Sequence, residues 1–254
     1  MLLDKIVEIK RQEVEELKKK GLASRRELPL LDFKKAIFQK DKISLIAEIK
    51  KASPSAGDIV ADFDPAKIAS IYRENNASAI SVLTDRRFFK GDLSFIKIAK
   101  KESGLPILRK DFIIDQIQID EAYNADADAI LLIARILSKN QLAEFILKAR
   151  ELGLSALVET HDERDIEKAL EARSEIVGVN NRDLDTLQID FSKSLKLVSK
   201  YPEIKAKVTV SESGIREKAQ ILELKGAGFS AVLIGESILK SNLISKKIHE
   251  LFDE

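Results

Sequence analysis

The sequence contains no cysteine and no tryptophan, and it has one methionine and two histidines. The absence of cysteine excludes disulfide bonds, thiolate nucleophiles and cysteine-ligated metal sites. The two histidines, His161 and His249, lie far apart in the sequence, so a histidine-rich metal site is not expected. We therefore predict that this protein has no metal site.

The chain also lacks an excess of charge of either sign and lacks long apolar runs. Lys and Arg number 43 and Asp and Glu number 42, so the net charge of +1 does not favour binding to nucleic acid or to a membrane surface. No segment approaches the roughly 20 apolar residues of a membrane span. Residues 1–21 have no uninterrupted apolar stretch of the kind found in secretory signals. We expect a cytoplasmic protein with neither a nucleic acid nor a membrane as partner.

The length of 254 residues is long for an ordinary domain but normal for an α/β barrel, which takes about 250 residues. Hydrophobic residues make up 44% of the chain, enough for a substantial core. Charged residues reach 33%, while Met and Cys are nearly absent. This balance resembles that of thermophile proteins, in which surface charges form ion-pair networks.

Two helices are expected before the first strand. The first ends near Gly21, and the second, shorter one lies within residues 29–38 ("PLLDFKKAIF"). The first helix is indicated by apolar residues that fall near one face: Leu3, Ile6, Val7, Val14 and Leu17.

Eight short apolar runs then alternate with charged segments of helical period, such as residues 64–76 and 163–173. The runs are rich in Val, Ile and Leu, as is typical of parallel strands that are covered on both faces. Strand followed by helix, repeated eight times about thirty residues apart, predicts a (β/α)₈ barrel, with a doubly wound open sheet as the alternative. We expect one domain, residues 1–254, whose residues 1–40 form a helical extension. The runs span residues 44–49, 78–83, 105–110, 128–134, 155–160, 175–180, 207–212 and 230–235.

Polar side chains recur where these strands end. The active sites of such barrels lie at the carboxyl-terminal ends of the strands, so groups there would converge on one opening and alter each other's pKa values. Each residue taken singly has a structural interpretation, for example an ion pair between Glu48 and Lys50, or Glu159 as the cap of the helix that starts near Asp162. The structural interpretation is weak as a whole, because it would have to hold at five strands together. The strand-end residues are Glu48, Lys50, Lys110, Glu159, Asn180, Arg182 and Glu212.

Two Ser/Gly loops follow the last two strands. In barrels, these loops and a short extra helix commonly bind phosphate through backbone N–H groups. "SESGI" contributes Ser213 and Gly214, and "IGESIL" contributes Gly235, Glu236 and Ser237. The sequence therefore predicts a phosphorylated small-molecule substrate.

Lys50 could add a cation on the side of the phosphate loops. The segment that follows it, "SPSAG" (residues 53–57), is interpreted as a mobile lid in which Ser53 and Gly57 permit movement.

The motifs "IAEIKKASPSAGDI", "LPILRKDFIID", "ILLIARIL", "LVETH", "VGVNNRDL", "VSESGI" and "LIGESIL" together resemble the indole-3-glycerol-phosphate synthase family of tryptophan biosynthesis. The likeness covers nearly the whole chain, including the helical extension. The family usually has Glu where Asp85 stands, which puts only the loop after the second strand in doubt.

The resemblance implies a reaction and no cofactor. In 1-(2-carboxyphenylamino)-1-deoxyribulose 5-phosphate, the ring carbon that bears the carboxylate attacks the C2 carbonyl of the sugar chain. Carbon dioxide and then water leave, and indole-3-glycerol phosphate remains. A carboxy-lyase that acts as a monomer is expected.

The resemblance also implies roles for particular residues. Lys110 would be the acid at the developing oxyanion, Glu159 the base and Lys50 a second acid. Glu48, Asn180 and Glu212 would position the lysines and the substrate hydroxyl, and Arg182 or Lys50 would face the carboxylate or phosphate. An apolar wall around the aryl ring would comprise Phe89, Phe112, Leu131, Leu184 and Leu233.

Three other functions are weighed against this one. A Schiff-base aldolase would use Lys110 as a nucleophile. Phosphoribosylanthranilate isomerase, a neighbouring phosphate-binding barrel, normally uses a cysteine as base, and this chain has none. A barrel that only senses a sugar phosphate would not need the intact acid and base groups.

Overall fold

The eight predicted apolar runs form parallel strands that close into a barrel. This arrangement is seen in the computed structural model, which describes residues 2–22, 25–241 and 243–253. The first strand of the barrel pairs with both the second strand and the last strand. The (β/α)₈ prediction is therefore confirmed and the open sheet is excluded. Around the barrel the strands are β1 (Ser44–Ile49), β4 (Ala79–Leu83), β5 (Ile107–Lys110), β6 (Ala129–Ile133), β7 (Ser155–Thr160), β8 (Ile176–Asn180), β9 (Val208–Glu212) and β10 (Ala231–Ile234).

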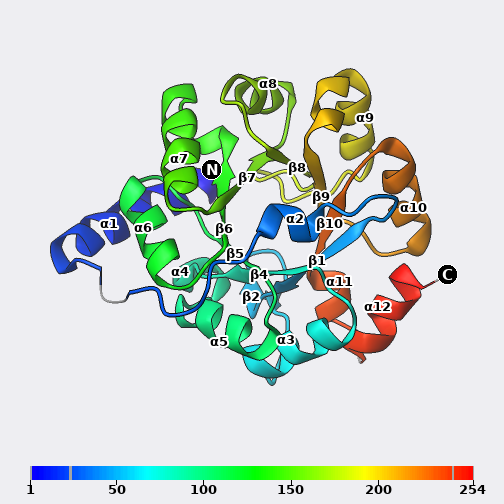
Figure 1. Ribbon diagram of the computed structural model, residues 1–254, viewed down its shortest axis with the longest axis horizontal. Helices are drawn as coiled ribbons and strands as arrows, with labels where there is room; N and C mark the ends of the chain where they lie inside the picture. The colour runs from blue at the N-terminus through cyan, green and yellow to red at the C-terminus, as the bar shows by residue number, and fades with distance from the viewer. Residues whose placement is uncertain (1, 23–24, 242, 254) are drawn as a thin grey trace.

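Helices surround this barrel (Figure 1). Several begin at a side chain that accepts backbone N–H groups, which is the usual way to satisfy the free donors of a first turn. Asp64, for example, accepts hydrogen bonds from the N–H groups of Ala66 and Lys67, and Pro65 opens the helix. The helices that follow the first strand are α3 (Pro65–Glu74), α4 (Arg86–Phe89), α5 (Ser94–Ser103), α6 (Gln116–Asn124), α7 (Lys139–Glu151), α8 (Glu163–Glu171), α9 (Ser192–Lys200), α10 (Lys218–Ala227), α11 (Glu236–Leu239) and α12 (Ile244–Phe252), with 3₁₀ turns η1 (Ala134–Ile136) and η2 (Pro202–Ala206).

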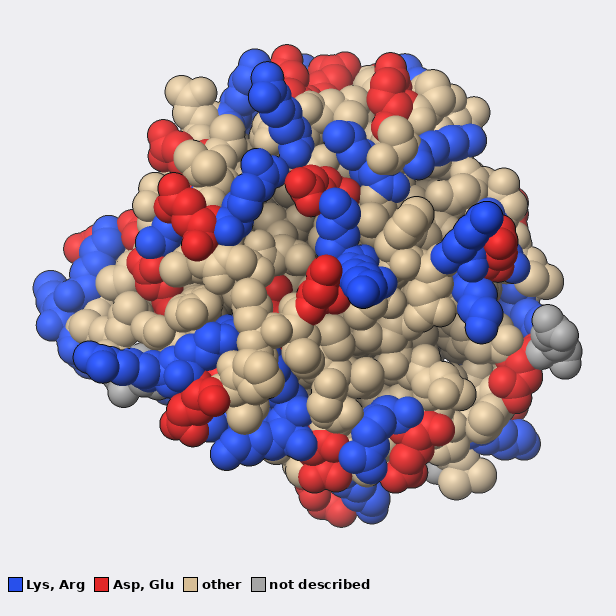
Figure 2. Space-filling model, viewed as in Figure 1, with Lys and Arg blue, Asp and Glu red and all other residues tan. Residues whose placement is uncertain are grey.

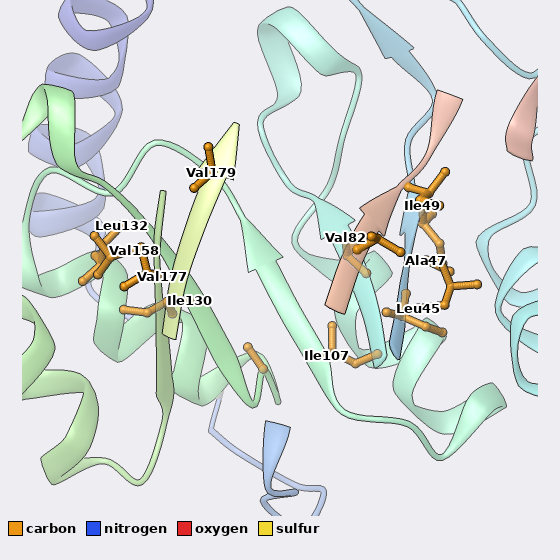
Figure 3. Close-up of a cluster of buried hydrophobic side chains, with 14 of the residues drawn as sticks. Leu45, Ala47, Ile49, Val82, Ile107, Ile130, Leu132, Val158, Val177 and Val179 are labelled. Atoms are coloured by element: carbon orange, nitrogen blue, oxygen red, sulfur yellow. The ribbon is translucent and has the colours of Figure 1, made fainter. Parts of the chain in front are cut away.

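The alternation of side chains along each strand produces two apolar layers. On β1, Leu45, Ala47 and Ile49 belong to the cluster between strands and helices, of which Figure 3 shows a part. Ile46 points the other way and belongs to the cluster inside the barrel. Because successive side chains on a strand face opposite sides, the residue two positions further on, Glu48, also faces inward.

Helix α2 (Phe33–Ile37) closes the amino-terminal end of the barrel. Phe33 and Ile37 are fully buried in the inner cluster, and Lys34 pairs with Glu175, which directly precedes β8, at 2.7 Å. The helix is shorter than the predicted span of residues 29–38. It begins after Asp32, whose carboxylate accepts the N–H of Lys35 at 2.9 Å, so the preceding residues lie outside it.

Helix α1 (Leu2–Lys20) lies at the opposite end of the barrel. It stops where predicted, because Gly21 has a φ of 73° and its N–H closes the last turn on the carbonyl of Leu17. Leu3 and Ile6 pack in the inner cluster together with Phe112, which follows β5. Since α1 and α2 cover opposite ends of the barrel, we propose that the extension and the barrel fold as one domain.

The charged residues of the surface are mixed in sign. On the face drawn in Figure 2, Lys and Arg alternate with Asp and Glu, and no broad area carries one sign. Among the described residues, no helix combines the length and the apolar content needed to cross a membrane.

The role of α2 as a closure leads to a stability prediction. Phe33→Ala should lower the free energy of unfolding by about 3–5 kcal/mol, because it leaves a cavity in a fully buried site. Phe38→Ala, at the position directly after α2 and 57% exposed, is the control and should change it by less than about 0.5 kcal/mol. Urea unfolding of both variants measures the difference, and equal effects would contradict the closure.

Candidate active site

A cavity of about 530 Å³ opens at the carboxyl-terminal ends of the strands. Its wall combines charged and apolar side chains, as a site for an aromatic, phosphorylated molecule would require. The predicted site residues that line it are Glu48, Lys50, Phe89, Lys110, Phe112, Leu131, Glu159, Asn180, Arg182, Leu184, Ser213, Gly214, Leu233, Gly235, Glu236 and Ser237.

The charged part of the wall follows from strand alternation. Lys110 is two residues beyond Leu108, and Glu159 is two residues beyond Leu157. Both leucines belong to the inner cluster, so the charged residues occupy the next inward layer above them. The barrel is therefore apolar in its lower layers and ionic at its opening.

Lys110 lies between carboxylates at the centre of this layer. Its Nζ is 3.0 Å from Glu212 Oε2 and 3.4 Å from Glu48 Oε2. Burial favours the neutral amine, but the charges of Glu212, Glu48 and Glu159 outweigh it and raise the pKa of Lys110 above its ordinary value. Lys110 is thus held as an ammonium ion.

Glu48 joins the two lysines. Its Oε1 lies 2.5 Å from Lys50 Nζ, and its Oε2 faces Lys110. Burial opposes ionisation, but the two ammonium groups overcome it and lower the pKa of Glu48 to about 2. Gly235 on the neighbouring strand end leaves room for this carboxylate, since a Cβ there would lie 2.4 Å from Oε1.

Glu159 is 2% exposed and contacts a histidine. His161 Nε2 lies 3.2 Å from Glu159 Oε1, and Nδ1 lies 3.6 Å from Asp165. Neither ring nitrogen makes a hydrogen bond of good geometry among the described residues, so both contacts are electrostatic. Burial lowers the pKa of His161, but Asp165 and Glu159 together raise it to about 9. Burial likewise opposes ionisation of Glu159, and His161 and Lys110 lower its pKa to about 2.

The alternative interpretation of Glu159 as a helix cap does not fit the structure. Helix α8 begins at Glu163, and its first turn is capped by Asp162, whose carboxylate accepts the N–H of Asp165 at 3.0 Å. Glu159 therefore faces the cavity without a capping bond to α8.

Glu212 lies beneath Lys110 and is fully buried. Its Oε1 has no hydrogen-bond partner among the described residues, and a Cβ on Gly178 would lie 2.4 Å from this atom. Burial raises the pKa of Glu212, Lys110 lowers it and the carboxylate of Glu159 raises it again, to about 7. Glu212 is the carboxyl group of this cluster whose protonation changes near neutral pH.

The Ser/Gly loops form another part of the wall. Ser213 and Gly214 have φ angles of 66° and 82°, so two successive residues adopt the left-handed conformation. Glu236 is close to two cations, Arg182 at 3.4 Å and Lys240 at 2.7 Å. The excess of positive charge suits an anion such as phosphate.

Ser53 is not among the described residues that line the cavity. It belongs to a small hairpin, β2 (Ala52–Ser53) with β3 (Gly57–Asp58), and its hydroxyl accepts the N–H of Ala56 at 3.2 Å. The neighbouring Ser55 accepts a bond from Arg182 at 3.4 Å, which links the hairpin to the loop after β8. The interpretation of this segment as a lid stays a prediction.

A model of the family described as indole-3-glycerol phosphate synthase matches residues 3–251. The chain belongs to the indole-3-glycerol phosphate synthase family. The resemblance inferred from the motifs is thereby confirmed.

Curated relatives support membership in the indole-3-glycerol phosphate synthase family along the whole chain. The indole-3-glycerol phosphate synthase of Desulforamulus reducens is 43% identical, over 99% of this chain and 97% of the relative. That of Acetivibrio thermocellus is 50% identical over 87% and 84%, and that of Endomicrobium trichonymphae is 46% identical over the full length of both.

Several residues in or beside this site were not predicted from the sequence. Lys240, which precedes α12, and Lys247, which belongs to α12, both line the cavity. They lie beyond the last strand, where no strand-end rule applies. His161 has a signal that could have been used: it is two residues beyond Glu159 and so faces the same side.

The raised pKa of Glu212 leads to a prediction about stability and pH. Because the folded pKa of about 7 lies above the ordinary 4.5, the contribution of Glu212 to stability is fully present below about pH 4.5 and is lost as the pH rises through 7. Glu212→Gln cannot titrate, so its stability relative to the unmodified chain should rise between pH 5 and pH 8, by at most about 1.4 kcal/mol per pH unit.

Urea unfolding at four pH values tests this prediction. Glu203→Gln, at an exposed position in η2, is the matched control and should show a constant difference. A constant difference for Glu212→Gln as well would rule out a raised pKa.

Proposed function

We propose that this protein catalyses the conversion of 1-(2-carboxyphenylamino)-1-deoxyribulose 5-phosphate into indole-3-glycerol phosphate, carbon dioxide and water. The observation that carries the proposal is one cavity that joins the Lys110 ammonium and the Glu159 carboxylate to an apolar wall and to two Ser/Gly loops. The family of the chain and the names of its relatives support the same product.

The chemistry requires one acid and one base near the C2 carbonyl. A carbon–carbon bond forms between the ring carbon that bears the carboxylate and C2, and the carbonyl electron pair moves to oxygen, which takes a proton. The bond to the carboxylate then breaks, carbon dioxide leaves and the ring regains its aromaticity. Finally the new hydroxyl leaves as water, and a proton is lost from the ring nitrogen or the neighbouring carbon.

Lys110 is proposed to act on the carbonyl oxygen. Its ammonium group is buried between carboxylates and stays charged, so it can donate a hydrogen bond to the negative charge that develops on oxygen. A raised pKa makes Lys110 a weak proton donor. Lys50, linked to it through Glu48, is proposed as the second acid, for the leaving hydroxyl.

Glu159 is proposed as the base. It is ionised at neutral pH, and His161 lies beside its carboxylate. The charge of Glu159 helps to raise the pKa of Glu212, so protonation of Glu159 would favour ionisation of Glu212. Glu212 and Asn180 are proposed to position the charged groups.

The remaining parts of the substrate match the two ends of the cavity. The phosphate is proposed to bind at the loops of Ser213, Gly214, Gly235 and Ser237, where Arg182 and Lys240 add positive charge. The aryl ring is proposed to lie against Phe89, Phe112, Leu131, Leu184 and Leu233. Since residues of one chain form this cavity, we further propose a monomer, and we expect it in the cytoplasm.

Direct measurement of product tests the proposal. Addition of the substrate to the purified chain should produce indole fluorescence, and carbon dioxide should be released in equal amount. The Schiff-base aldolase makes the opposite prediction, because borohydride with a ketose phosphate would then trap a covalent adduct on Lys110. A chain that binds the substrate without turnover would act as a sensor instead.

Lys110→Gln tests the acid. Glutamine keeps a hydrogen-bond donor for Glu212 but removes the charge, so kcat should fall by about 10²-fold or more while the chain stays folded. Lys101→Gln, at an exposed position in α5, is the control. Turnover close to that of the unmodified chain would remove Lys110 from the mechanism.

Glu159→Gln tests the base. The amide is nearly isosteric but cannot accept a proton, so kcat should fall by about 10²- to 10⁴-fold with little change in KM. An intermediate that has lost carbon dioxide but not water should accumulate in single-turnover experiments. Glu163→Gln, with a side chain 51% exposed in α8, is the control. A full rate of dehydration in Glu159→Gln would assign the base to another group.

A further inference from the structure

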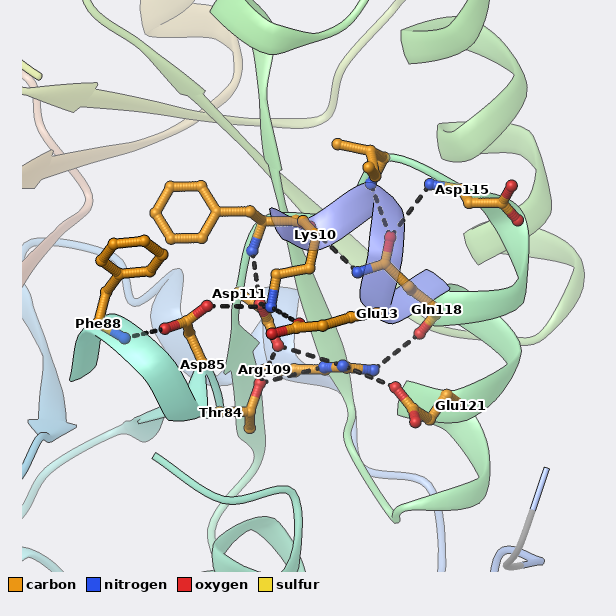
Figure 4. Close-up of polar contacts among 12 residues, drawn as sticks. Lys10, Glu13, Thr84, Asp85, Phe88, Arg109, Asp111, Asp115, Gln118 and Glu121 are labelled. Carbon is orange, nitrogen blue, oxygen red and sulfur yellow. Dashed lines mark hydrogen bonds and ion pairs between the residues drawn. The ribbon is translucent and has the colours of Figure 1, made fainter. Parts of the chain in front are cut away.

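A second cluster of buried charges lies beneath α1 (Figure 4), and one of its members, Asp111, also lines the cavity. Lys10 of α1 has a side chain only 4% exposed. Its Nζ lies 2.9 Å from Asp111 Oδ1, 3.0 Å from Asp85 Oδ2 and 2.6 Å from Glu13. Burial favours the neutral amine, but Asp111 and Asp85 outweigh it and raise the pKa of Lys10, which is therefore an ammonium ion.

The two aspartates belong to neighbouring loops that carry parts of the cavity wall. Asp111 directly follows Lys110, and its Oδ1 also accepts the N–H of Phe112 at 2.8 Å. Asp85 caps the short helix α4, because its Oδ1 accepts the N–H of Phe88 at 2.7 Å. The last residue of α4 is Phe89.

Lys10 thus bridges the loop after β5 and the loop after β4. The rings of Phe112 and Phe89, one from each loop, lie 6.1 Å apart and both line the cavity. The two aspartate oxygens that face Lys10 are buried, and Asp85 Oδ2 has no hydrogen bond in directed geometry, only the ion pair with Lys10.

The other attachments of Asp111 come from the barrel side. Its Oδ2 accepts hydrogen bonds from Thr84 at 2.6 Å and from Arg109 at 3.2 Å. Arg109 also pairs with Glu121 of α6 at 2.8 Å. These bonds hold Asp111 in place but do not compensate the charge of Asp85. The ion pair with Lys10 of α1 supplies that compensation. Without Lys10, two buried carboxylates would repel each other across the two loops.

We propose that Lys10 is a positioning residue that sets the separation of Phe89 and Phe112, and so the shape of the aryl end of the cavity. The inference rests on the proposed function, since it assigns the aryl ring to these two side chains. It makes α1 part of the active site, although Lys10 itself does not line the cavity among the described residues. Displacement of a reacting group by about 1 Å can lower a rate by about 10²-fold.

Lys10→Met tests the proposal with two probes of different ends of the cavity. The aryl probe is 2-aminobenzoate, and the phosphate probe is glycerol 3-phosphate. Binding of 2-aminobenzoate, measured by calorimetry, should weaken by about tenfold, and kcat should fall by about tenfold or more. Binding of glycerol 3-phosphate should change by less than about twofold, because the phosphate loops lie across the cavity.

Two further variants make the result specific. Lys10→Met combined with Asp85→Asn removes the repulsion and keeps a capping oxygen, so it should recover both stability and aryl binding. Lys18 lies on the same helix, has a side chain that is 44% exposed and pairs with Asp115 at 2.7 Å. Lys18→Met removes this ion pair and should change the binding of neither probe. The double variant also provides a folded protein should Lys10→Met alone unfold.

The outcomes separate this proposal from the proposed function. Unchanged aryl binding and kcat in Lys10→Met would overturn the positioning role, and so would an equal loss of both probes, which indicates a general loosening of the barrel. Suppose that Lys10→Met weakens the binding of 2-aminobenzoate but not that of glycerol 3-phosphate, and that the unmodified chain makes no indole product. This outcome would support the positioning role while refuting the proposed function.

Discussion

The alternation of side chains along parallel strands is the constraint on which the rest of this structure depends. In a closed barrel, every second residue must face the interior, and the interior is filled in layers. Ile46 and Leu108 fill a lower layer, and Glu48 and Lys110 occupy the next one because they lie two residues further along the same strands. The same rule that builds the core therefore also aims the charged groups at one cavity.

Burying these charges is costly unless each has a partner, and the structure meets that cost by grouping them. Lys110 has two carboxylates within 3.4 Å, and one of these, Glu48, also contacts Lys50. Burial and the carboxylate of Glu159 raise the pKa of Glu212 to about 7, although Lys110 lowers it. The cations beside Glu48 and Glu159 outweigh burial and lower the pKa values of these two groups. Close packing thus produces carboxyl groups of different protonation within one site.

The segment before the first strand completes both ends of the barrel. Phe33 of α2 fills the amino-terminal end, where a barrel would otherwise expose its inner layer. Helix α1 packs Leu3 and Ile6 near Phe112 at the opposite end, and through Lys10 it joins two loops that carry aromatic residues of the cavity. The extension thus contributes to the core at one end of the barrel and contacts two loops of the cavity at the other.

The sequence by itself determined the strand runs, the repeat of strand and helix and the set of strand-end residues, because strand periodicity and composition are local properties. Glu48 and Lys110 could be named from their positions alone. The tertiary structure decided which of them meet: Glu212 lies beneath Lys110 rather than on the cavity wall, and Ser53 turns into its own hairpin. It also decided the contact of Lys10 with Asp111, about a hundred residues away in the chain. Such contacts, and the protonation states they set, depend on distances between distant segments, which no local pattern encodes.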